Sequence, residues 1–132
     1  LSSNRLVLYA NAGHCAPIHF RFEDESFRFL KPTGGLLGLI REQSFSVENI
    51  RMKPNDILIL YTDGITEAMD QNGNIFGENR ICELVKKYKD ETAKHIAYMI
   101  IEHVQKFNAN SKYNDDKTIV VVKRRSLESI SD

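Results

Sequence analysis

The hydrophobic periodicity changes twice along these 132 residues, and this change is the strongest constraint on the fold. Short apolar runs of strand length fill the first half, two stretches with helical spacing follow, and another strand-like run lies near the C-terminus. Strands that come first and last, with consecutive helices between them, are typical of α+β proteins whose strands pair mostly antiparallel. We therefore expect one α+β domain over residues 1–125 and a flexible tail over residues 126–132.

The predicted strands share branched and aromatic residues and are bounded by turn signals. They cover Arg5–Ala10, His19–Phe22, Ser26–Leu30, a segment containing Phe45, Val47 and Ile50, then Asp56–Thr62 and Thr118–Lys123. Helical stripes predict one helix through Ile81, Leu84, Val85 and Tyr88, and a second through Ile96, Ala97, Ile100, Val104 and Phe107. Asp90 or Thr92 is the predicted N-cap of the second helix, because a short side-chain oxygen can accept free backbone N–H groups.

Composition excludes several classes of protein. Eighteen Lys and Arg residues balance eighteen Asp and Glu residues, unlike the strongly basic surface of a nucleic-acid-binding protein. The longest apolar runs are far shorter than the ~18–20 residues that span a bilayer, so we expect no membrane contact by this segment. Cys15 and Cys82 form no CxxC pair, and we expect two buried thiols in a reducing, cytoplasmic compartment.

Carboxylates gather at the ends of two predicted strands. Asp63 directly follows one apolar strand, with Glu67 four residues further on, and Asp115 and Asp116 directly precede the last strand. If these strands pair antiparallel, Asp63 and Asp115 converge, and Glu67 lies near them if a helical turn begins at Gly64. Clustered carboxylates repel one another unless a cation or proton neutralises them, and oxygen-only ligands favour Mg²⁺ or Mn²⁺ over Zn²⁺. Spacing alone leaves an ordinary Asp-Gly turn and an ordinary Asn-Asp-Asp loop as alternatives.

Four motifs occur in a fixed order along the chain. They are Asn-Ala-Gly-His at 11–14, Gly-Leu-Leu-Gly-Leu at 35–39, Tyr-Thr-Asp-Gly-Ile-Thr-Glu-Ala at 61–68 and Asp-Asp-Lys-Thr at 115–118. Each motif alone is weak, but the ordered set resembles the SpoIIE/RsbU-like branch of the bacterial PPM metal-dependent protein phosphatases. The resemblance implies a layered α/β sandwich of mostly antiparallel sheets with packed helices. It also implies hydrolysis of phosphoserine or phosphothreonine at a centre of two or more Mn²⁺ or Mg²⁺ ions.

The resemblance assigns roles to the acidic residues. Asp63 is expected to ligate a metal and Asp115 to complete the catalytic site, with Asp116 beside it in a supporting role. Glu67 matches a position that in related enzymes reaches an additional, weaker metal or its waters. These four residues are the candidate metal-site residues. Two divalent ions acidify a bridging water and hold phosphoryl oxygens for in-line attack, so no covalent phosphoenzyme is required.

One motif of the family has no counterpart in this sequence. The first acidic motif supplies the aspartate that bridges both metals and lies upstream in the family, and the cluster around Asp24 occurs in the wrong order to replace it. We therefore expect the C-terminal portion of a phosphatase domain, incomplete at its N-terminus, with weak metal affinity and little or no turnover in isolation. The alternative is a catalytically inactive pseudo-phosphatase that binds a regulatory partner.

The resemblance also implies a partner and a location. The expected substrate is a phosphorylated regulatory protein, such as an anti-anti-sigma factor, in bacterial signalling. The expected location is cytoplasmic, as the output domain of a larger sensor protein. Apolar surface left uncovered by a missing segment favours association, so a homodimer is also expected.

Overall fold

The computed structural model describes residues 6–9, 15–30, 48–111 and 116–126. In chain order the elements are β1 (Leu6–Tyr9), β2 (Ile18–Arg21), β3 (Ser26–Phe29), β4 (Glu48–Arg51), β5 (Ile57–Tyr61), α1 (Asp63–Thr66), α2 (Gly77–Lys87), α3 (Ala93–Phe107) and β6 (Ile119–Lys123). Strands thus come first and last, with helices between them, which confirms the predicted α+β class.

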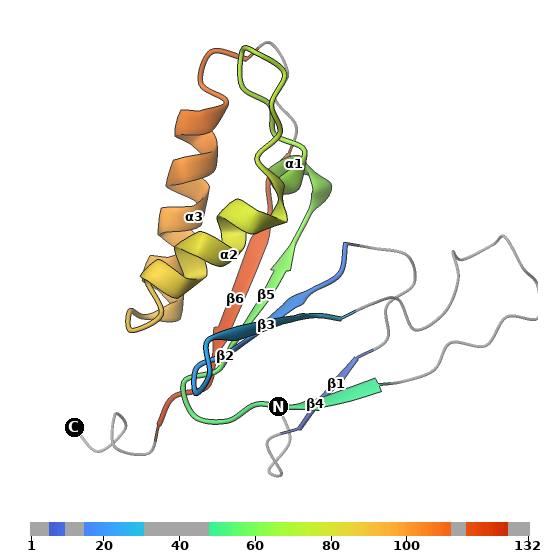
Figure 1. Ribbon diagram of the computed structural model, residues 1–132, viewed down its shortest axis with the longest axis vertical. Coiled ribbons are helices and arrows are strands. Elements are labelled where there is room, and N and C mark those ends of the chain that lie inside the picture. Colours follow the sequence, from blue (N-terminus) through green and yellow to red (C-terminus); the bar gives the residue numbers. More distant parts are fainter. Residues whose placement is uncertain (1–5, 10–14, 31–47, 112–115, 127–132) are drawn as a thin grey trace, which may run out of the picture.

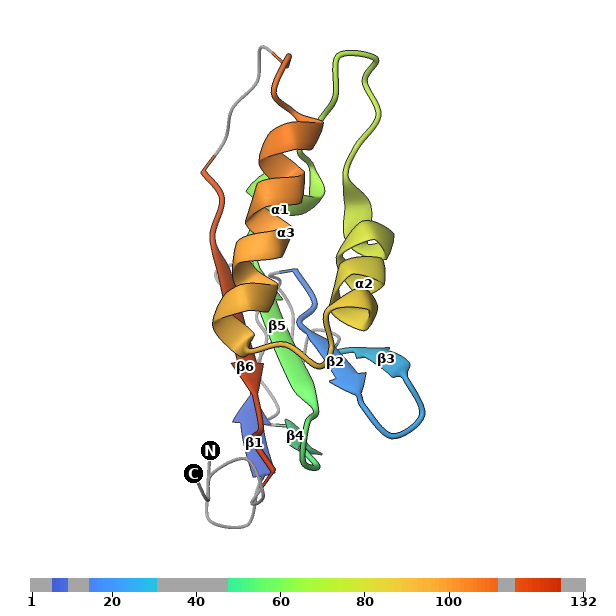
Figure 2. The same ribbon diagram turned by 90° about the vertical axis from the view of Figure 1, so that its left-hand side faces the viewer.

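The described strands form two antiparallel sheets. The larger sheet has the order β3-β2-β5-β6, and β1 pairs with β4 in a separate two-stranded sheet. Helices α2 and α3 cover one face of the larger sheet, and the β1–β4 pair lies on its other side (Figures 1 and 2). The layered arrangement expected from the sequence is therefore confirmed.

The main core lies between the larger sheet and the helices. Alternate residues of a strand point to the same face, and residues three and four apart line one side of a helix, so both periodicities meet here. The fully buried members are Ile18, Phe20, Ile57, Ile59, Ile65, Ile81, Val85, Ile96, Ile100 and Val104. Of the two predicted caps of α3, Thr92 is correct, because its side-chain oxygen accepts the His95 N–H at 3.1 Å.

A smaller cluster lies on the opposite face of the larger sheet. It contains Leu30, Ile50, Met52 and Leu58, with the half-buried Val122 against it. Leu60 and Val120 are register partners nearer the other end of this face and remain 39% and 49% exposed. Such exposed apolar surface is consistent with self-association, and the homodimer stays a prediction.

Two further expectations concern the cysteines and the C-terminal tail. Cys15 and Cys82 are half-buried, so the expectation of two buried thiols was wrong. The chain after β6 is held at Arg124, whose guanidinium donates to the Met52 carbonyl at 2.6 Å. Residues 127–132 lie outside the described part of the chain, and the tail stays a prediction. Among the described helices, none has the length and apolar character needed to cross a membrane.

Candidate functional site

The candidate site lies where β5 ends beside the start of β6. The strands pair antiparallel up to Tyr61 and Ile119, which are register partners. Two more hydrogen bonds extend this ladder: the Thr62 N–H donates to the Thr118 carbonyl, and the Thr118 N–H donates to Thr62 Oγ1, each at 3.1 Å. The antiparallel pairing of these two strands, which the predicted cluster of carboxylates requires, is therefore present.

Gly64 allows the two chain segments to approach closely at this corner. A Cβ atom built on Gly64 would lie 1.8 Å from the carbonyl oxygen of Asp116 and 2.8 Å from its carbonyl carbon. Real Cβ atoms do not approach backbone this closely, and backbone held by the adjoining strand pair cannot rotate aside as a flexible side chain can. The glycine therefore places the backbone next to Asp63 directly against the chain at Asp116.

The helical turn on which the placement of Glu67 depends is present as α1, which contains Gly64 and begins one residue before it, at Asp63. The N–H of Glu67, which caps this short helix, donates to the Asp63 carbonyl at 2.8 Å. The i, i+4 spacing places both residues on one side of the turn. Both are exposed, so their carboxylates can reach an external ligand.

The residues that follow the Asn-Ala-Gly-His motif lie against the end of β5. The Cys15 thiol donates to Asp63 Oδ1 at 2.5 Å, and the Tyr61 hydroxyl donates to the Ala16 carbonyl at 2.8 Å. Burial raises the pKa of Cys15 to about 11, and the hydrogen bond to Asp63 and the negative charge of Asp63 add to this effect. Burial also raises the pKa of Tyr61. Both groups therefore remain protonated donors at neutral pH.

Sequence reasoning missed the contact between Cys15 and Asp63. The two residues are 48 positions apart, and no local pattern connects them. The one available signal was the position of Cys15 directly after the Asn-Ala-Gly-His motif, because motif segments of one site meet in space.

The described residues supply carboxylate donors at this corner but not a complete metal site. No group of three or more His, Cys, Asp or Glu residues among them is arranged to hold a metal ion. Asp115 lies outside the described residues, as do the motifs at 11–14 and 35–39. The donor chemistry of Asp63, Glu67 and Asp116 fits a hard cation such as Mg²⁺ or Mn²⁺, because these ions prefer oxygen ligands.

Comparison with known families identifies the relationship. Residues 2–125 match the family model described as Stage II sporulation protein E (SpoIIE). The chain belongs to the SpoIIE family. This match confirms the resemblance expected from the four ordered motifs and extends over all of them.

Relatives of this SpoIIE-family chain include two curated proteins. It is 30% identical to Protein IcfG of Synechocystis over 125 residues, which cover 92% of this chain and 19% of IcfG. It is 24% identical to the phosphoserine phosphatase RsbU of Bacillus subtilis over 117 residues, which cover 89% of this chain and 34% of RsbU. The chain thus spans about a fifth and about a third of the length of these two relatives.

The fold is similar to that of the SiaA PP2C domain of Pseudomonas aeruginosa, with a TM-score of 0.72 and 17% sequence identity. The alignment covers 91% of this chain and 47% of that domain. This similarity confirms the expected phosphatase-type layered fold for the part of the domain that this chain represents.

Proposed function

We propose that this chain is part of a metal-dependent phosphatase that hydrolyses phosphoserine or phosphothreonine on a regulatory protein, such as an anti-anti-sigma factor. Membership of the SpoIIE family supports the phosphatase class. The observation that carries the proposal is the antiparallel pairing of β5 and β6, which sets Asp63 beside the chain at Asp116. The name of RsbU, a phosphoserine phosphatase, is consistent with the proposed substrate class.

In this proposal Asp63 and Asp115 are the catalytic metal ligands, and Asp116 and Glu67 support the same site. Bound Mg²⁺ or Mn²⁺ supplies an acidified water and neutralises phosphoryl oxygens. The protein orients its ligands for this purpose. Cys15 holds one oxygen of Asp63 by a hydrogen bond and leaves the other oxygen available.

The test is Mn²⁺-dependent hydrolysis of p-nitrophenyl phosphate by the full-length protein. Changing even a partner of a metal ligand lowers activity by about 10–100-fold, so Asp63→Asn is expected to lower kcat/KM by at least about a hundredfold. Asp90→Asn is the matched control, because Asp90 is an exposed aspartate between α2 and α3. We expect it to leave kcat/KM unchanged.

The same variants, assayed with a phosphorylated anti-anti-sigma protein, test the substrate. Release of inorganic phosphate that requires Mn²⁺ and Asp63 supports the proposal. Turnover that Asp63→Asn leaves intact would contradict the site assignment. Tight binding of the phosphoprotein without any phosphate release would support the pseudo-phosphatase alternative instead.

A further inference from the structure

A pocket of about 480 Å³ lies at the other end of β5 from the Asp63 corner. Its walls come from the β2–β3 hairpin, the end of β4 and the turn that leads into β5. Asp56, in the pocket wall, and Asp63 flank the five residues of β5. At about 3.3 Å per residue of strand the two regions are roughly 20 Å apart, so the pocket is distinct from the candidate metal centre.

Positive side chains are prominent in the pocket lining, which includes Arg21, Arg28, Arg51 and Lys53. Arg28 is the register partner of His19 on the neighbouring strand, so the two side chains project from the same face of the sheet. Within the described part of the chain, no hydrogen bond or ion pair engages the guanidinium group of Arg28 or Arg51. Both groups are exposed and available to an anion.

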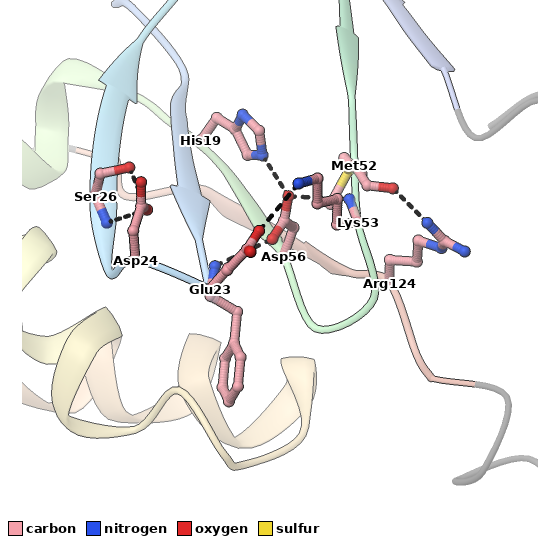
Figure 3. A network of polar contacts seen from close by, with 9 residues as sticks. His19, Glu23, Asp24, Ser26, Met52, Lys53, Asp56 and Arg124 are labelled. Atoms are coloured by element: carbon pink, nitrogen blue, oxygen red, sulfur yellow. Dashed lines mark hydrogen bonds and ion pairs between the residues drawn. The ribbon is translucent and has the colours of Figure 1, made fainter.

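The buried carboxylate in the pocket wall is already occupied by protein donors. Asp56 is 2% exposed and accepts hydrogen bonds from the backbone N–H groups of Phe22 and Lys53, each at 3.0 Å. Its Oδ2 atom also lies 3.0 Å from His19 Nε2 (Figure 3). Its acceptor positions are therefore occupied by these three groups, and the bonds from backbone N–H groups leave its negative charge in place.

The two exposed carboxylates of the lining also have protein partners. Asp24 accepts from the N–H of Ser26 at 3.1 Å and from its hydroxyl at 2.6 Å. Glu23 pairs with the Lys53 ammonium at 3.0 Å, near the buried Asp56 (Figure 3). The lining carries four Lys and Arg charges against three carboxylate charges, so its surplus is one positive charge.

His19 provides a second, independent observation. Its side chain lines the pocket and is 2% exposed, and one ring nitrogen faces Asp56. The other nitrogen, Nδ1, is buried and has no hydrogen-bond partner among the described residues. Since the Asp56 carboxylate only accepts, Nε2 carries the proton, and the unpaired Nδ1 of the neutral ring is an acceptor that a water or an O–H or N–H group of the molecule carrying the phosphate can satisfy.

We propose that this pocket binds the phosphate group of a phosphorylated ligand. Planar guanidinium groups bind phosphate oxygens through paired hydrogen bonds, and Arg28 and Arg51 present two such groups. The volume falls within the range of small-molecule sites and exceeds what a bare phosphate ion fills. The phosphate is therefore carried by a larger group, either a free small molecule or a phosphorylated side chain of a protein.

The test is calorimetric titration of the full-length Asp63→Asn protein in EDTA, which removes metal-dependent binding at the other end of β5. The probes are O-phospho-L-serine, a phosphoserine peptide and the same peptide without phosphate. The two phosphorylated probes are expected to bind saturably, and the peptide without phosphate is expected not to bind. Because charge-assisted hydrogen bonds are the strong ones, Arg28→Gln and Arg51→Gln are each expected to weaken it by about tenfold.

Lys94→Gln is the matched control, because Lys94 is an exposed cation on α3 outside the pocket. The affinity of this variant for the phosphorylated probes is expected to remain within twofold of that of the parent protein. Arg28→Lys and Arg51→Lys keep the charge and remove the planar guanidinium group, so they are expected to lose less affinity than the Gln variants.

Equal affinity for both phosphorylated probes supports a free small molecule as ligand, and tighter peptide binding supports a phosphorylated protein segment. The absence of saturable binding, or affinity that all four arginine variants leave unchanged, would overturn the proposal. Neither result depends on phosphatase activity, because no metal is present.

Discussion

Strand β5 is flanked by two aspartates whose surroundings are opposite. Asp56, before the strand, is 2% exposed and binds two backbone N–H groups and the His19 ring. Asp63, after the strand, is exposed, and its one side-chain hydrogen bond among the described residues comes from the Cys15 thiol. The comparison separates a carboxylate whose acceptor positions are filled by protein from one that keeps positions for a ligand.

The reason for the difference is the energy of burying charge. A carboxylate removed from water is stable only if donors replace the lost hydration, and the three donors around Asp56 do so. Such a group stabilises the fold and has little capacity left for an external cation. Asp63 remains hydrated and can exchange water for a metal ion. The proposed division is therefore between a structural end and a functional end of one strand.

The largest expected effect is on stability at the Asp56 end. Asp56→Ala removes the acceptor of one buried and two part-buried donors and leaves His19 and two backbone N–H groups unsatisfied. We expect the free energy of unfolding to fall by about 3–5 kcal/mol, measured by urea denaturation.

Asp63→Ala is the matched control for this change, because it removes the same group from an exposed position. A fall of no more than about 0.5 kcal/mol is expected, as for other exposed substitutions. Equal losses of stability in the two variants would remove the distinction between the two ends of β5.

A smaller effect is expected from Gly64→Ala at the functional end. The added Cβ overlaps the backbone of Asp116, so the corner must open. Overpacking of this kind lowers the free energy of unfolding by about 1–3 kcal/mol, and the displacement of Asp116 from Asp63 lowers Mn²⁺-dependent turnover as well. Urea denaturation and the p-nitrophenyl phosphate assay measure the two effects separately.

Gly73→Ala sharpens this test, because its restriction has another origin. Gly73 has a φ of +83°, and a Cβ added there would meet no atom within 4 Å, so alanine is strained by backbone conformation alone. We expect a loss of about 1–2 kcal/mol in stability with turnover unchanged. If Gly64→Ala behaved in the same way, close approach at the corner would have no role in the site.

Most of the fold was predictable from the sequence, because local patterns encode it. The strand before Asp63 and the stripes of α2 and α3 agree with the predicted segments, since periodicity reports which face is buried. The acidic residues at the strand ends also indicated that these two strands pair. This pairing brings Asp63 to the chain at Asp116. The contacts of Cys15 with Asp63 and of His19 with Asp56 were not predictable, because each joins residues 37 or more positions apart without a local signal. The different burial of the two aspartates depends on those same contacts.

The smallest expected effect concerns the reactivity of the Cys15 thiol, which reports on Asp63 without requiring turnover. A pKa raised to about 11 means that the folded state favours the protonated thiol, so its contribution to stability is complete below the ordinary thiol pKa and is lost as the pH rises through about 11. At pH 8 the thiolate fraction, and with it the alkylation rate, is expected to be roughly a hundredfold below that of an ordinary cysteine.

Asp63→Asn removes the negative charge beside Cys15 and weakens the hydrogen-bond acceptor, while the burial of the thiol is unchanged. Alkylation of Cys15 by iodoacetamide is therefore expected to become severalfold faster. Cys82, whose pKa is raised to about 11 by burial and by charges other than Asp63, serves as the internal control and keeps its rate. Peptide mass spectrometry resolves the two sites, and equal acceleration at both would show that Asp63 acts on the whole fold rather than on its neighbour.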